Sequence, residues 1–177
     1  MGGDISKASI WADADVYTAP LGTANPASAL TAFSGSWDLV GLLDGDDGFT
    51  EGRNEDVNDF YAWGGILVAT GRRHFRLQMG FTALENNDTT RDLIWPNSSG
   101  GYLVVPRPKK IKMAFELRED VDKVRRLITA NYAEVTVNGD IKDSEADLTK
   151  YQLVASIFPD SSVSPARLFV EQIHEGS

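Results

Sequence analysis

The chain has 177 residues, a formal net charge of −9 and no cysteine. This length fits one domain with a proper core, and the lack of cysteine excludes disulfides, thiolate nucleophiles and sulfur metal sites. The acidic balance argues against tight nucleic-acid binding, which needs Lys and Arg on phosphates, and no apolar run approaches the ~18 residues of a membrane span. Because the first residues also lack the apolar core of a signal peptide, we expect an intracellularly made, soluble single domain over residues 1–177, with no membrane partner.

The first 36 residues predict an N-terminal arm. Residues 20–36 are rich in Pro, Ala, Ser, Thr and Gly, a composition typical of loops, and residues 14–19 form only a short candidate strand. Several apolar side chains in this part need burial somewhere, namely Ile10, Trp11, Val16, Tyr17 and Leu21. We therefore expect the arm to reach a neighbouring subunit, with Trp11 and Tyr17 among the self-assembly residues.

Alternation of polar and apolar residues predicts most of the strands. The clearest run covers residues 75–83, a second covers residues 110–118, and residues 126–137 are interpreted as one looser strand. Shorter candidates are residues 37–43, 66–70, 151–158 and 167–173. Residues 44–65, which are rich in Gly and acidic groups, are expected to form an extended loop or hairpin tip.

A single helix is clearly predicted, over residues 87–95. Asn87, Asp88 and Thr89 supply capping groups, and Pro96 ends the helix because proline restricts the residue before it. Residues 119–126 are compatible with a helical turn or with a hairpin connection. Many strands and one short helix predict a mainly β fold, a sandwich or a barrel.

The sequence offers no pattern for catalysis or metal binding. Asp44 and Glu55 match the first and twelfth positions of a calcium loop, but Gly48 and Phe49 occupy positions that need a ligand and the turn glycine. We therefore interpret this stretch as an Asp/Gly turn. His74 and His174 have no second nitrogen ligand nearby in sequence. We expect no catalytic residue, no metal site and no cofactor, and a protein that is not an enzyme.

The most suggestive local cluster is aromatic: Phe60, Tyr61 and Trp63, followed by a glycine pair. One interpretation is a turn that packs on the core. The other is a loop that inserts into another subunit, because aromatic anchors dominate the energetics of interfaces. On the second interpretation these three residues are self-assembly residues.

Five short motifs occur in order along the first half of the chain. They are Asp-Val-Tyr-x-Ala-Pro at 15–20, Val-Gly-Leu-Leu-Asp-Gly-Asp at 40–46, Tyr-Ala-Trp-Gly-Gly at 61–65, Phe-Thr-Ala-Leu-Glu at 81–85 and Leu-Ile-Trp-Pro at 93–96. This series resembles the major tail tube proteins of long-tailed, siphovirus-type bacteriophages, especially those of actinobacterial phages. The second half of the chain resembles them by pattern alone.

The resemblance implies a structural virion protein. Its β-sandwich would close with its neighbours into a ring-wide barrel, and stacked hexameric rings would form the tail tube through which the genome is ejected. The implied partners are further copies of the chain, a tape-measure protein, and tail terminator and tip proteins. DNA would pass through the lumen without specific binding. The implied location is the virion tail, assembled in the cytoplasm of the host bacterium.

Charge suggests how such a lumen would work, because an acidic inner wall would repel the moving DNA. We expect this wall to draw on six carboxylates, namely Glu51, Glu55, Asp56, Glu116, Glu134 and Asp147. Two other readings stay open. One is a tube protein of a contractile or secretion-type injection machine, and the other is a monomeric β-barrel that binds a small apolar ligand.

Overall fold

Two antiparallel β-sheets form the body of the protein in the computed structural model, which describes residues 8–119 and 123–176. Sheet A has the strand order β2-β1-β5-β6-β9, built from β1 (Asp13–Ala19), β2 (Asp38–Leu39), β5 (Lys112–Arg118), β6 (Lys123–Thr129) and β9 (Phe169–Glu175). Sheet B has the order β3-β4-β8-β7, built from β3 (Thr50–Tyr61), β4 (Leu67–Ala83), β7 (Tyr132–Val137) and β8 (Tyr151–Phe158). The mainly β expectation is confirmed. Both sheets are open in the described part of the chain, so they do not form a closed barrel.

The core lies between the two sheets, where the alternation seen in the sequence places apolar side chains on the inner faces. The ring of Phe115 from sheet A is central: it makes edge contacts with Phe49, Phe81 and Phe169 at centroid distances of 5.5, 6.1 and 6.4 Å. Sheet B contributes the buried residues Leu77, Met79, Phe81, Val135, Leu153, Ala155 and Ile157. Burial of each large side chain contributes about 1.5–3 kcal/mol, which explains why this alternation fixes the strand register.

Helix α1 (Asp88–Ile94) packs beside this core and confirms the predicted helix over residues 87–95 to within one residue at each end. The side chain of Asn87 accepts a hydrogen bond from the Thr90 amide at 2.9 Å and donates one to the Val40 carbonyl at 2.7 Å. The same residue thus caps the helix and ties it to the strand-like segment after β2. No described helix has the length and apolar character needed to cross a membrane.

The outer face of sheet A is covered by the chain between β1 and β2. Trp37 and Phe33 from this segment pack on a small second core with Ala19, Ala114 and Ile128. Within the expected arm over residues 1–36, residues 13–19 therefore pair inside sheet A and Phe33 packs on its outer face, while residues 1–7 lie outside the described residues. Contact of this arm with a neighbouring subunit stays a prediction. Two of the apolar side chains that needed a partner find it in their own chain: Val16 is fully buried in the main core, and the ring of Tyr17 stacks on Phe33. Ile10 and Leu21 stay exposed, at 86% and 52%.

Three details of the strand pattern differ from the sequence expectations. Residues 126–137 are not one strand but parts of β6 and β7, which belong to different sheets, so that both faces of the run are apolar. Residues 66–70 and 75–83 belong to one strand, the 17-residue β4. In the stretch over residues 119–126, residues 123–126 belong to β6, which pairs directly with β5, while residues 120–122 lie outside the described residues.

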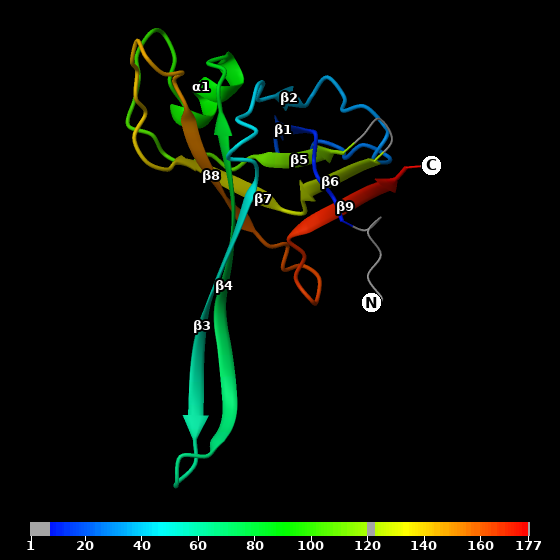
Figure 1. Cartoon of the computed structure of the whole chain (residues 1–177), viewed down its shortest axis with the longest axis vertical. Helices are drawn as coiled ribbons and strands as arrows, with labels where there is room; N and C mark the ends of the chain where they lie inside the picture. The colour runs from blue at the N-terminus through cyan, green and yellow to red at the C-terminus, as the bar shows by residue number, and fades with distance from the viewer. Residues whose placement is uncertain (1–7, 120–122, 177) are drawn as a thin grey trace.

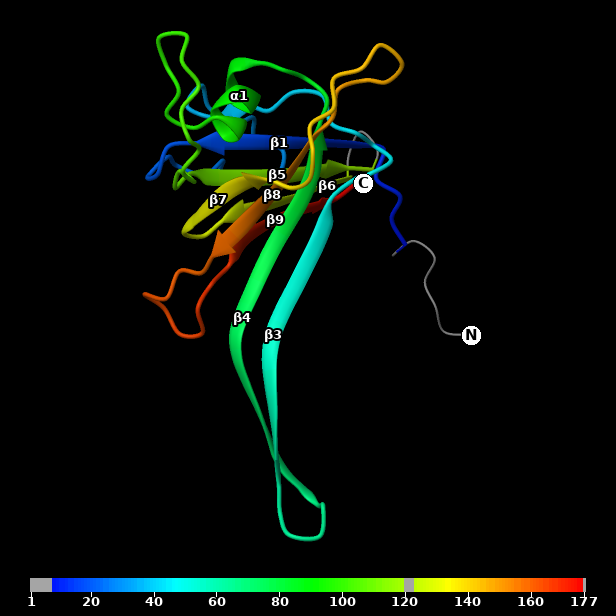
Figure 2. The ribbon, with the colours of Figure 1, turned by 90° about the vertical axis from the view of Figure 1, so that its left-hand side faces the viewer.

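The β3–β4 hairpin gives the molecule its long axis. It leaves the body and points away from it, whereas α1 and the loops over residues 96–110 and 138–150 lie at the opposite end (Figures 1 and 2). Strand β8 pairs with β4 only from Leu77 onward, so residues 67–76 of β4 have β3 as their sole strand partner. At 3.3 Å per residue, this free part of the hairpin is roughly 30 Å long.

Candidate functional site

The tip of the β3–β4 hairpin carries an exposed apolar surface. Ala62 closes the turn by donating to the Ile66 carbonyl at 2.8 Å, and Gly64 and Gly65 take positive φ values of 88° and 78°, which a side chain would disfavour. Trp63 is 101% exposed. The large apolar residues exposed along the tip are Phe60, Tyr61, Trp63, Ile66, Leu67 and Val68. A two-stranded hairpin is at best marginally stable alone in water, and an exposed apolar surface of this kind is typical of interaction sites.

The two strands of the hairpin carry opposite charges. β3 holds Glu51, Glu55, Asp56 and Asp59 with a single arginine, and the free part of β4 holds Arg72, Arg73 and Arg76 with His74. Two pairs cross between the strands: Arg72 Nη1 lies 3.3 Å from Glu55 Oε2, and His74 Nδ1 lies 2.8 Å from Asp56 Oδ2. Such exposed pairs contribute little to stability, but they leave one acidic and one basic strand side by side.

Sheet B has two unpaired strand edges in the described part of the chain. β3 pairs only with β4, and β7 pairs only with β8, apart from one isolated bridge between Ala133 and Ile111. Exposed edges with free N–H and C=O groups are templates for pairing with another chain. The two edges lie on opposite sides of the same sheet, so copies of the protein can add side by side in a repeating manner.

The outer face of sheet B is polar and nearly uncharged. It presents Gln78 and Gly80 from β4, Gln152, Val154 and Ser156 from β8, and Tyr132, Glu134 and Thr136 from β7. Arg76 follows on the same face of β4, and Thr82 is buried beneath Asp47. Of the six carboxylates expected for an acidic wall, Glu134 lies on this face. Glu116 is instead buried in an ion pair, and Glu51 lines a cleft between the sheets, so neither is available to a wall formed by sheet B.

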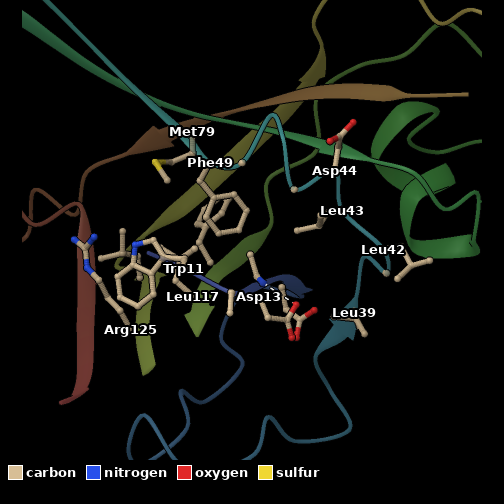
Figure 3. Close-up of a pocket in the computed structure, with 18 of the residues that line it drawn as sticks. Trp11, Asp13, Leu39, Leu42, Leu43, Asp44, Phe49, Met79, Leu117 and Arg125 are labelled. Carbon is tan, nitrogen blue, oxygen red and sulfur yellow. Dashed lines mark hydrogen bonds between the residues drawn. The ribbon is translucent and has the colours of Figure 1, made fainter. Parts of the chain in front are cut away.

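A cleft of about 750 Å³ opens between the sheets where the hairpin leaves the body. The loop that carries Leu42, Leu43 and Asp44 borders one side, and Trp11, Leu117 and Arg125 lie on the other (Figure 3). The charged residues that line the cleft are Asp13, Asp15, Asp44, Glu51, Glu85 and Arg125, five acids and one base. The cleft thus combines an apolar interior with an acidic rim.

Arg118 organises the carboxylates at one side of this cleft. Its guanidinium donates to Asp13 and Asp15 at 2.6 Å each and also contacts Glu116. The hydrogen bond from Arg118 is the largest cause that lowers the pKa of Asp13. Burial opposes the charge on Arg118, but its bonds to Asp13 and Asp15 outweigh burial and raise its pKa. Asp13 and Arg118 therefore stay ionised at neutral pH.

The loop from Asp44 to Phe49 is fixed by its own side chains. Asp44 accepts from the Asp46 amide at 3.0 Å and pairs with Lys150, and Asp47 accepts from the Thr82 hydroxyl at 2.8 Å. These bonds give an Asx-type turn, as the Asp/Gly interpretation predicts. In the part of the chain that the structure describes, no three His, Asp or Glu side chains converge as metal ligands.

The five expected self-assembly residues fall into three groups. Phe60, Tyr61 and Trp63 lie together at the exposed end of the hairpin. Trp11 lines the cleft, with the ammonium of Lys123 5.8 Å from its ring centre. Tyr17 is half-buried and its ring stacks on Phe33 of the same chain at 4.0 Å, so that face is already occupied.

Sequence reasoning missed two surfaces. The cleft is formed by residues far apart in the chain, for which no local pattern exists. The second surface is the exposed run Tyr102, Leu103, Val104 and Val105, which lies between a glycine pair and a proline. Its apolar character was the signal that could have revealed it.

Comparison of the chain with protein-family models and with curated protein sequences gives no match.

Proposed function

We propose that the protein is a structural subunit of a phage tail tube, which assembles from further copies of itself in hexameric rings that stack into a hollow tube. The observation that carries this proposal is the β3–β4 hairpin. It extends roughly 30 Å beyond the body as a continuation of sheet B and ends in an uncovered aromatic tip. A monomer gains nothing from such an element, whereas a stacked assembly covers it.

Two strand edges support closure of a ring. Placing the β3 edge of one copy beside the β7 edge of the next would join the four-stranded sheets into one continuous barrel and remove both edges. The contact is heterologous, because it joins two different surfaces, and heterologous contacts close into rings when the rotation per subunit permits.

The direction of the hairpin supports stacking. Its tip and the loops over residues 96–110 and 138–150 lie at opposite ends of the long axis (Figure 1). Copies that stack in one orientation would therefore bring the aromatic tip of one ring onto the body of the next. Burial of aromatic anchors is the usual source of interface energy, which gives Phe60, Tyr61 and Trp63 their role in this proposal.

The outer face of sheet B would form the inner wall of the tube. A polar wall that carries Glu134 and Arg76 would offer phosphate groups few cationic partners, so DNA would slide past without adhering. The tape-measure protein would occupy the same lumen before the genome, and terminator and tip proteins would meet the exposed ends of the tube. Sedimentation velocity over a wide range of concentration and salt tests the proposal: large concentration-dependent species support it, and a strictly monomeric mass contradicts it.

A further inference from the structure

The loop over residues 97–110, termed the basic loop, presents apolar side chains followed by cations. Tyr102, Leu103 and Val105 are 78%, 54% and 84% exposed. Arg107, Lys109 and Lys110 follow directly, and residues 97–110 contain no Asp or Glu. Pro106 and Pro108 restrict the backbone between the apolar and the basic part, which lowers the entropy lost when such a segment is ordered at a contact.

The cleft between the sheets has the complementary chemistry. Phe49, Met79 and Leu127 provide apolar lining, and five of the six charged residues around it are acidic. Asp13 and Asp44 both have pKa values below the ordinary value, because Arg118 and Lys150 respectively donate hydrogen bonds to them. Asp13 and Asp44 therefore stay charged at neutral pH. Arg118, Lys150 and Arg53 already pair with four of the acids, yet the lining keeps more acids than bases, and this surplus favours a cationic segment.

The basic loop and the cleft lie at opposite ends of β5. The loop leads into Lys112, the first residue of β5, which pairs with Ala19 at the end of β1. The cleft includes Leu117 near the end of β5 and Asp13 at the start of β1. Figure 2 shows the loop on the left of the body and the start of β1 on the right. The loop of one copy is thus directed away from its own cleft and toward a neighbour.

We propose that the basic loop of one copy docks in the cleft of the next copy, with Leu103 and Val105 in the apolar interior and the following cations at the acidic rim. In Figure 2 the line from the basic loop to the start of β1, whose Asp13 lines the cleft, runs across the long axis of the hairpin. This contact would therefore join copies side by side within a ring. This docking contact rests on the proposed ring assembly. It uses surfaces that the pairing of the β3 and β7 edges leaves uncovered.

The test uses one variant for each side of the contact. Leu103→Ser with Val105→Ser removes the apolar part of the loop, and Leu42→Arg places a cation and extra volume at the cleft, where Leu42 is 70% exposed. Each variant should raise the concentration needed for association by at least about tenfold, as loss of an interface anchor does. Leu21→Ser with Leu30→Ser removes two exposed leucines away from the loop, the cleft and the hairpin, and serves as the matched control.

Mixing the two variants gives the sharper result. The loop variant keeps an intact cleft and the cleft variant keeps an intact loop, so one productive contact remains and a 1:1 pair should form. Sedimentation at a concentration where each variant alone is monomeric should therefore show mixed dimers. Mixed samples that stay monomeric, or a control that weakens association as much as either variant, would overturn the docking contact. A wild-type chain that never associates would contradict the tube proposal itself. A small apolar molecule bound in the cleft of that monomer would show that the cleft holds a ligand instead of the basic loop.

Discussion

Glu116 and Arg126 form a buried ion pair across β5 and β6 on the outer face of sheet A, with 5% and 6% of their side chains exposed. The guanidinium of Arg126 also donates to the carbonyls of Ser28 and Thr31 at 2.9 and 2.6 Å and lies 4.5 Å from the centre of the Phe33 ring. The pair therefore fastens the segment between β1 and β2 to the sheet beneath it. This segment is the part of the chain that the sequence suggested as an arm.

Breaking this pair should strongly lower the free energy of unfolding. Arg126→Met leaves Glu116 buried with only Arg118 as a cationic partner and frees two carbonyls, so we expect a loss of about 3–5 kcal/mol. The double variant Glu116→Leu with Arg126→Met should lose less than the sum of the two single variants, because no charge of this pair is left behind. Urea unfolding at 25 °C measures all three. The control variant Arg53→Met, in an exposed pair with Glu51, should change stability by only about 0.5 kcal/mol or less. If the losses of the two single variants at Glu116 and Arg126 simply add in the double variant, the two residues are not energetically coupled.

The same substitution at two tryptophans should separate assembly from folding. Trp63→Ala should leave the thermal midpoint of the monomer unchanged, since Trp63 is fully exposed, and should weaken assembly by about 2 kcal/mol or more. Trp37→Ala should instead lower the stability of the monomer by about 3–5 kcal/mol, because Trp37 is 6% exposed and packs on Phe33. Thermal unfolding and sedimentation distinguish the two. Normal polymerisation of Trp63→Ala would show that the hairpin tip is not an assembly contact.

Removal of residues 1–20 should prevent folding rather than yield a folded monomer. β1 lies inside sheet A, where it pairs with β2 on one side and with all seven residues of β5 on the other, and it supplies Val16 to the core. Its loss leaves an unpaired edge and a cavity in one step. Far-ultraviolet circular dichroism and the solubility of the truncated chain measure the effect. A soluble, cooperatively unfolding product would show that the β1 position is dispensable.

Asp13 should contribute to stability in a defined pH range. Arg118 holds its pKa below the ordinary value of 3.8, so the contribution is complete above that value and is lost as pH falls through the lower pKa of the folded state. Asp13→Asn should therefore be less stable than the wild type near pH 6, and the difference should shrink as pH falls below 3.8. Urea unfolding from pH 6 downward measures the difference, and a gap that does not change with pH would point to a cause other than this ionisation.

The local sequence pattern predicted those elements in which the spacing of apolar residues matches the face that is buried in the fold. The second half of β4 alternates strictly because Leu77, Met79 and Phe81 face the core, and Asn87 with Pro96 marks α1 at both ends. β3 escaped prediction as a strand because its Asp, Asn and Gly content has low β propensity. It is a strand because β4 offers it a partner along its length, which is information held elsewhere in the chain.

The candidate surfaces also differ in how far the sequence could predict them, because one is contiguous in sequence and the others join distant residues. The aromatic tip is contiguous in sequence, so Phe60, Tyr61 and Trp63 stood out before the structure. The fate of Tyr17 depends on Phe33 folding back over sheet A, and the cleft joins residues from 11 to 127. Such long-range contacts follow from the packing of two sheets and leave no local signature.

Electron cryomicroscopy of the purified full-length chain at high concentration tests the central claim most directly. We expect hollow tubes of stacked six-membered rings, with the outer face of sheet B lining the lumen and the tip at Trp63 buried against the adjacent ring. Isolated particles of monomer size at every concentration and salt condition, or assemblies in which the hairpin tip stays in solvent, would contradict it.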